Sequence, residues 1–84
     1  MKFCYITFRS VTFSQKGEGV LRRAGIGCQL QRTPRWMEEQ GCGYSLRVRQ
    51  GDISRAAALL RENGIAYRKL YLLRENGAFE ELML

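Results

Sequence analysis

The sequence predicts an α+β fold: a ferredoxin-like βαββαβ sandwich, in which a four-stranded antiparallel sheet carries two helices on one face. The expected order along the 84 residues is strand, helix, strand, strand, helix, strand. An internal repeat supports two βαβ halves, because Val20–Ile26 and Leu59–Ile65 share one pattern and each joins a helix to a strand. Both expected helices also have a single apolar face. Right-handed crossovers then give the strand order 4-1-3-2.

The first half is expected to place one helix between two strands. Phe3–Phe8 is rich in aromatic and β-branched residues, and its alternation turns Cys4, Ile6 and Phe8 to one face. Thr12 and Gln15 have the spacing of a capping box at a helix start. Gly25 is a natural helix end, and Ile26–Arg32 alternates as a second strand with Cys28 facing the core. The apolar helix face would comprise Phe13, Gly17, Val20, Leu21 and Ala24.

The second half repeats this arrangement after a long connection. Tyr44–Arg49 alternates as the third strand, and a second helix is expected to start at Gln50–Asp52 and to end at Asn63-Gly64. Its buried stripe would be Ile53, Ala56, Ala57 and Leu60. Ile65–Leu73 is the fourth strand, so the ferredoxin-like domain is expected to span residues 1–73. In the tail, residues 74–84, Asn76-Gly77 is a hairpin-turn signal, and the tail is expected to add an edge strand or a dimer contact.

Composition excludes several classes of function. The formal net charge is +6, and eleven of the fourteen basic residues are arginines spread along the chain, which favours anionic partners without choosing among them. The chain has three cysteines and no histidine, which excludes a Cys/His zinc site and a histidine-based triad within one chain. No metal and no cofactor are expected. No apolar stretch approaches the roughly 18 residues of a membrane span, and the N-terminus shows no secretion signal, so a cytoplasmic location without a membrane partner is expected.

Cys42 is the predicted functional residue. The connection that begins at Thr33 has no periodicity and ends in Gly-Cys-Gly, so the thiol has no bulky neighbour. In the predicted topology it lies where the first strand stops and the first helix begins, near Arg9 and Ser10. The helix start and the arginines at that end, Arg35 among them, would stabilise a thiolate and lower the pKa of the cysteine. Without a histidine base, such a thiolate suits holding and passing on sulfur or selenium better than hydrolysis.

Several motifs resemble the Se/S carrier protein-like family of small bacterial proteins. They are Ile6-Thr7-Phe8-x-Ser10, Leu21-x-x-Ala24-Gly25-Ile26, Thr33-Pro34-Arg35 and Cys42-Gly43-x-x-Leu46-Arg47, and together they cover roughly Met1 to Leu73. The resemblance implies a carrier thiol at Cys42. The binding residues predicted around it are Gly43, Arg9, Ser10, Arg35 and Trp36. It implies a sulfur or selenium carrier, rather than a turnover enzyme, that works between donor and acceptor proteins.

Two other functions stay open on the residues alone. The first is a non-catalytic interaction or regulatory domain that forms a homodimer or binds another protein. Its contact residues would be Trp36 and Met37 of the long connection. RNA binding would use Phe3 and Tyr5 of the first strand together with the positive charge. However, Tyr44 shares a face with Leu46 and Val48 and is expected to point to the core, so nucleic acid is not among the expected partners.

Overall fold

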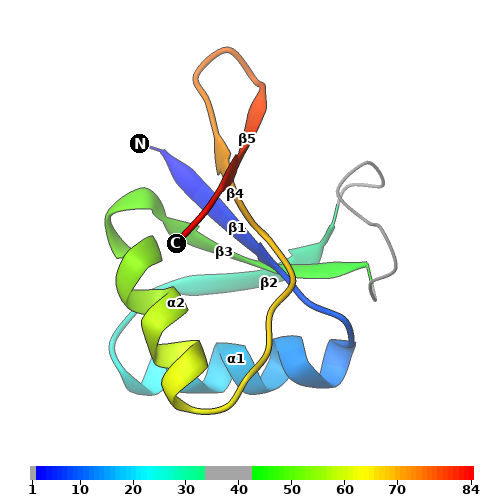
Figure 1. Ribbon diagram of the computed structural model, residues 1–84, viewed down its shortest axis with the longest axis vertical. Coiled ribbons are helices and arrows are strands. Elements are labelled where there is room, and N and C mark those ends of the chain that lie inside the picture. Colours follow the sequence, from blue (N-terminus) through cyan, green and yellow to red (C-terminus); the bar gives the residue numbers. More distant parts are fainter. Residues whose placement is uncertain (1, 34–42) are drawn as a thin grey trace.

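The computed structural model describes residues 2–33 and 43–84. In chain order its elements are β1 (Phe3–Thr7), α1 (Val11–Arg23), β2 (Cys28–Arg32), β3 (Tyr44–Arg49), the 3-10 turn η2 (Gln50–Asp52), α2 (Ile53–Glu62), β4 (Leu70–Leu73) and β5 (Phe79–Leu82). Within the described ranges, five strands form one antiparallel sheet in the order β2-β3-β1-β4-β5, with both helices packed on one side of it (Figure 1). The predicted α+β class and the order 4-1-3-2 are confirmed. The arrangement is compatible with a ferredoxin-like sandwich, but the four strands predicted for it become five.

The main core lies between the sheet and the two helices. Cys4 and Ile6 are 0% exposed and Phe8 is 1% exposed, as their alternation predicted. The predicted stripe of α2 is buried as well. Burying each large apolar side chain stabilises the fold by roughly 1.5–3 kcal/mol, so this layer supplies most of the stability. The residues of the stripe are Ile53, Ala56, Ala57 and Leu60.

The two helix-to-strand junctions, Leu21–Ile26 and Leu60–Ile65, have the same hydrogen bonds. In each, the final isoleucine donates its N–H to the carbonyl of the leucine at the start, at 2.9 Å in both copies. Gly25 and Gly64 have φ values of 80° and 70°, and each donates to the carbonyl three residues earlier, at 3.0 and 3.1 Å. This is the Schellman arrangement that ends a helix at a glycine. The isoleucine N–H groups are thus bonded to the helix ends, and β2 and β4 begin later than the predicted Ile26 and Ile65, at Cys28 and Leu70.

The N-cap of α1 is Ser10, and the prediction that a capping box at Thr12 starts the helix is wrong. The Oγ atom of Ser10 accepts a hydrogen bond from the N–H of Phe13 at 3.1 Å. Ser10 has extended backbone dihedrals, with φ −141° and ψ 155°, which is usual for an N-cap. Thr12 therefore lies inside the first turn and is exposed.

The buried face of α1 keeps Gly17, Val20 and Leu21 of the predicted one and differs from it in the first turn. Phe13 is 37% exposed, and Ser14 is completely buried in its place. The Ser14 hydroxyl donates to the carbonyl of Val11 at 2.7 Å, so its burial leaves no unpaired donor. Gly17 lies on this face as predicted, and a Cβ there would lie 3.1 Å from the Phe8 ring and 3.2 Å from Leu60. The helix therefore packs closely against the core at Gly17.

The tail forms β5, which confirms the added edge strand. Gly77 has a φ of 86°, and the N–H of Arg74 donates to the carbonyl of Ala78 at 2.7 Å to close the hairpin. β5 pairs with β4 from Leu73–Phe79 to Leu70–Leu82. The ring of Phe79 packs edge-on against Tyr5 with centroids 5.5 Å apart, on the side of the sheet opposite the helices. This contact gives the tail its apolar cover.

Candidate functional site at the neck of the 33–43 connection

The connection predicted to hold the site joins the sheet through Thr33 and Gly43, called the neck below. The N–H of Thr33 donates to the carbonyl of Gly43 at 2.6 Å, next to the Arg32–Tyr44 pair of the β2–β3 ladder. Gly43 is buried and has a φ of 79°, a conformation that residues with a Cβ rarely adopt. This predicted site residue therefore sets the direction in which the chain enters β3.

The neck lies at the end of the sheet where α1 begins, as the predicted topology required. Ser45, two residues into β3 from the neck, pairs with Thr7 at the end of β1 and with Gln31 of β2. After Thr7 the chain passes through the exposed Arg9 to the N-cap Ser10 (Figure 1). The first turn of α1 has no acidic side chain, so no carboxylate there offsets the partial positive charge of the helix N-terminus.

Two buried hydroxyl groups at this end of the sheet have no hydrogen-bond partner among the described residues. They belong to Thr33, which is 7% exposed, and to Ser45, which is 0% exposed. A buried hydroxyl without a partner costs about 1–3 kcal/mol. Both lie at or beside the neck and are free to donate. Strand alternation places Ser45 on the face opposite Tyr44, Leu46 and Val48 and gives no sign of its burial, and Thr33 stood in the Thr-Pro-Arg motif without a role.

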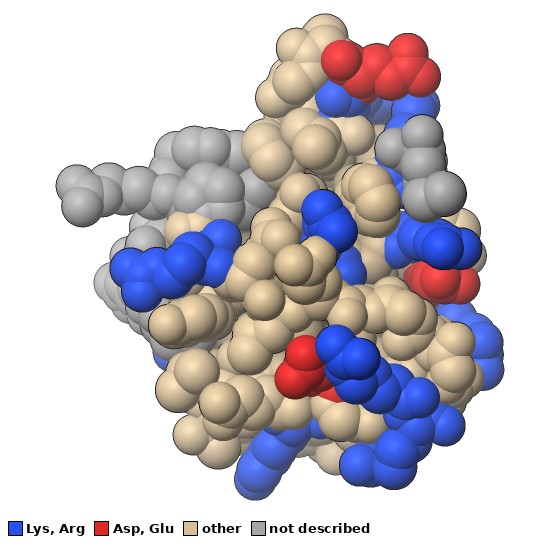
Figure 2. Space-filling model, turned by 180° about the vertical axis from the view of Figure 1, so that it is seen from behind, with Lys and Arg blue, Asp and Glu red and all other residues tan. Residues whose placement is uncertain are grey.

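The guanidinium of Arg32 also lies at the neck, with its carbon 5.4 Å from the centre of the Tyr44 ring. Elsewhere the basic side chains are dispersed, and Figure 2 shows them spread across the face seen from behind. This distribution agrees with the sequence, in which the arginines form no single run. The positive charge near the neck therefore comes from the N-terminus of α1 and from Arg9 and Arg32.

Cys4 is buried and not poised for chemistry. It is 0% exposed, and burial raises the pKa of its thiol above the usual value. This agrees with its predicted place inside the first strand. A thiol that is both inaccessible and protonated is a poor nucleophile.

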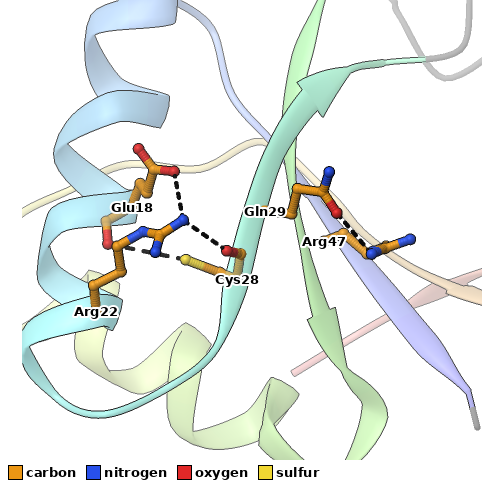
Figure 3. Close-up of polar contacts among 5 residues, drawn as sticks. All are labelled: Glu18, Arg22, Cys28, Gln29 and Arg47. Carbon is orange, nitrogen blue, oxygen red and sulfur yellow. Dashed lines mark hydrogen bonds and ion pairs between the residues drawn. The ribbon is translucent and has the colours of Figure 1, made fainter.

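Cys28 is half-buried, and its side chain points toward α1 (Figure 3). Burial raises the pKa of its thiol, and this effect outweighs the opposing influence of Arg22, while Glu18 raises the pKa further. The Sγ atom lies 3.9 Å from the carbonyl of Glu18. Arg22 donates to the carboxylate of Glu18 at 3.2 Å and to the carbonyl of Cys28 at 3.1 Å. These contacts tie the start of β2 to α1, while burial keeps the pKa of the thiol above its usual value.

The structure locates three of the six predicted site residues. Gly43, Ser10 and Arg9 all lie at the end of the sheet where β1 stops. The other three, Arg35, Trp36 and Cys42, lie outside the described residues. Among the described residues, no group of three or more Cys, Asp or Glu side chains could hold a metal ion. No helix in the described ranges is long and apolar enough to cross a bilayer.

The aromatic residues considered for RNA binding lie on the side of the sheet opposite the helices. Tyr5 and Tyr71 are each 8% exposed there, packed with the partly buried Phe3, Leu73 and Phe79. Base stacking needs an exposed ring face. Tyr5 would have to leave this cluster to offer one, so the arrangement does not favour the RNA-binding hypothesis.

The protein is therefore a small α+β protein of two βαβ halves with an added edge strand. Its β2–β3 connection enters β3 through Gly43, at the end of the sheet where α1 begins. Comparison with known proteins identifies its family. The family described as "Putative Se/S carrier protein-like" matches residues 3–72, and the chain belongs to it. No curated protein and no solved structure gives a significant match.

Proposed function

We propose that the protein holds a sulfur or selenium atom on the thiol of Cys42, as a persulfide or selenosulfide, and passes it to a partner protein. The family description supplies the carrier function in general terms. The observation that carries the assignment to Cys42 is the state of the other two thiols. Cys4 is fully buried, and the pKa values of Cys4 and Cys28 are both raised. A carrier thiol must be reachable and must ionise, so Cys42 is the remaining candidate.

The described residues beside Cys42 support an anionic group at this position. Gly43, its covalent neighbour, is pinned to Thr33 at the end of the sheet where α1 begins. The uncompensated helix N-terminus favours a thiolate or a persulfide anion within its reach. The unpaired hydroxyls of Thr33 and Ser45 are donors that such an anion could accept from. The exposed Arg9 and the predicted contribution of Arg35 would add to the positive potential.

The proposed transfer follows the chemistry of thiol–disulfide exchange. The Cys42 thiolate attacks the terminal sulfur of a persulfide on a donor protein, and a new S–S bond forms at Cys42. The S–S bond of the donor breaks at the same time, and the donor thiolate leaves with the electron pair. In the second step a nucleophile of the acceptor attacks the terminal atom, and Cys42 returns as a thiolate. A donor with a terminal selenium atom reacts in the same way through a sulfur–selenium bond. Neither step needs an external oxidant or reductant.

Intact-mass spectrometry after incubation with a persulfide donor tests the proposal. A cysteine desulfurase charged with cysteine is a suitable donor, and the protein should gain the mass of one sulfur atom. The Cys42→Ser variant should lose this gain, whereas Cys28→Ala should keep it. Addition of a reducing thiol should remove the extra atom, as expected for a persulfide.

The alternative is a non-catalytic interaction or regulatory domain. It predicts that Cys42 titrates with an ordinary pKa near 8.5 and forms no adduct with any donor. That result, obtained with a folded protein and an active donor, would refute the carrier proposal. An adduct on Cys28 rather than Cys42 would refute the assignment of the thiol while leaving the family function in place.

A further inference from the structure

A second candidate site lies near the opposite end of β3 from the neck, on its last residues. Here the surface forms a hollow of about 230 Å³ across β2, β3 and β1. The middle of this site is separated from Tyr44 by several residues of strand, each adding about 3.4 Å. It is therefore distinct from the proposed carrier site. Its lining includes Phe3, Gly27, Gln29, Arg47, Val48 and Arg49.

Arg47 is held in place by two neighbouring strands. Its guanidinium donates to the side-chain oxygen of Gln29 on β2 at 2.7 Å (Figure 3). On the other side its central carbon lies 4.4 Å from the centre of the Phe3 ring on β1. Gln29 is the direct cross-strand neighbour of Arg47, and Phe3 is a diagonal one. A guanidinium has five N–H donors, so the bond to Gln29 leaves others free for a ligand.

Arg49 adds a second positive charge to the same hollow. It lies two residues after Arg47, on the same face of β3, and pairs with Phe3 in the β1–β3 ladder. Arg49 is exposed, and among the described residues neither arginine forms an ion pair. Two arginines therefore line one small hollow, and no acidic side chain of the described residues lines it with them.

We propose that this hollow binds a tetrahedral oxyanion of the phosphate or sulfate class, either free or as the terminal group of a small molecule. One guanidinium can engage both oxygens of a carboxylate, whereas a tetrahedral anion offers oxygens to two guanidinium groups at once. Its double negative charge also matches the two uncompensated arginines. The volume lies below the roughly 300–1,000 Å³ of sites for drug-sized ligands, which limits the occupant to a small group.

An NMR titration of the full chain, monitored through the backbone amide chemical shifts, tests this proposal. Inorganic phosphate, sulfate, glycerol phosphate and acetate are added separately at constant ionic strength. Phosphate or sulfate should give saturable shifts of residues in β2 and β3 around Arg47. Stronger binding of glycerol phosphate than of inorganic phosphate would assign the site to a phosphate ester, and the reverse to the free ion. Acetate binding as tight as phosphate binding would overturn the tetrahedral class.

Matched variants separate a specific site from general charge attraction. Arg49→Gln should weaken phosphate binding by about tenfold or more, since a charge-assisted hydrogen bond is lost. Arg55→Gln removes the same charge from α2, outside the hollow, and should change the affinity less than about twofold. Cys42→Ser should bind as tightly as the unmodified protein. Shifts that rise linearly without saturation, or equal weakening by Arg55→Gln, would overturn the proposal. Arg47→Gln provides a second test and should also weaken phosphate binding. A thermal unfolding scan verifies that each variant is folded.

Discussion

Replacing Gly17 by alanine tests how closely α1 packs on the rest of the protein. The added Cβ would lie 3.1 Å from Cζ of Phe8, 3.2 Å from Cδ2 of Leu60 and 3.3 Å from Cδ1 of Leu46. These three side chains are at most 1% exposed and come from three different parts of the fold. A flexible surface group could move away from a new methyl, but these neighbours are enclosed by the core. We therefore expect Gly17→Ala to destabilise the protein.

Two opposing effects set the size of the change. Alanine stabilises a helix interior by about 1 kcal/mol relative to glycine. Overpacking of a well-filled core typically costs about 1–3 kcal/mol. The sum is a destabilisation of about 0–2 kcal/mol for Gly17→Ala. Gly19 provides the control, because a Cβ there meets only the flexible end of Arg23, at 3.4 Å. Gly19→Ala should therefore stabilise the protein by up to about 1 kcal/mol.

The difference between the two variants isolates the packing cost, since the helix-propensity gain is common to both. Urea unfolding followed by circular dichroism should place Gly17→Ala below Gly19→Ala by about 1–3 kcal/mol. For a domain of this size, each kcal/mol corresponds to roughly 4–8 °C in Tm. If Gly17→Ala stabilises the protein as much as Gly19→Ala does, the close approach of α1 to the core is wrong.

Three further predictions concern the cap and the buried thiols. Ser10→Ala should lower the free energy of unfolding by about 1 kcal/mol, whereas Thr12→Ala should change it by less than about 0.5 kcal/mol. Equal losses for the two variants in urea unfolding would contradict Ser10 as the N-cap and support the capping box at Thr12. In the folded protein, a thiol reagent should label Cys4 most slowly and Cys28 more slowly than the proposed carrier cysteine, as followed by mass spectrometry of digested samples. The raised pKa values of Cys4 and Cys28 mean that the folded state keeps protons which the unfolded chain releases above about pH 8.5, so stability should fall as the pH rises beyond that value. Urea midpoints compared across this range should decline less steeply in Cys28→Ala, and an unchanged slope would contradict the pKa shift.

The features that the sequence predicted well depend on local chemistry. The Leu21–Ile26 and Leu60–Ile65 junctions are specified by a glycine that permits positive φ and by the hydrogen bonds around it. All of this lies within six residues. The stripe of α2 likewise follows from periodicity within one helix. Because each half is locally specified, two equivalent halves were enough to predict the sheet order.

The features that the sequence did not predict depend on tertiary contacts. Both Ser10 and Thr12 can cap a helix, and the packing of α1 on the rest of the protein decides that Ser14 is buried and Phe13 is exposed. The start of β4 moved from Ile65 to Leu70 for a similar reason. The Thr7 hydroxyl accepts the N–H of Lys69 at 3.1 Å, so the backbone pairing with β1 is irregular before Leu70. Neither the N-cap of α1 nor the start of β4 can therefore be predicted from a short window of sequence.

The hypothesis about Cys42 combines a topological claim with a chemical one, and the two can be judged separately. The topological claim places the neck at the end of the sheet where α1 begins. It holds for the described residues, because Ser45 pairs with Thr7 and the Thr33–Gly43 bond continues the β2–β3 ladder. The chemical claim is that a thiol joined to this neck ionises readily and accepts a sulfur or selenium atom. A failure to load Cys42 in the folded protein would therefore refute the chemistry alone, since the placement of its neighbour Gly43 would be unchanged.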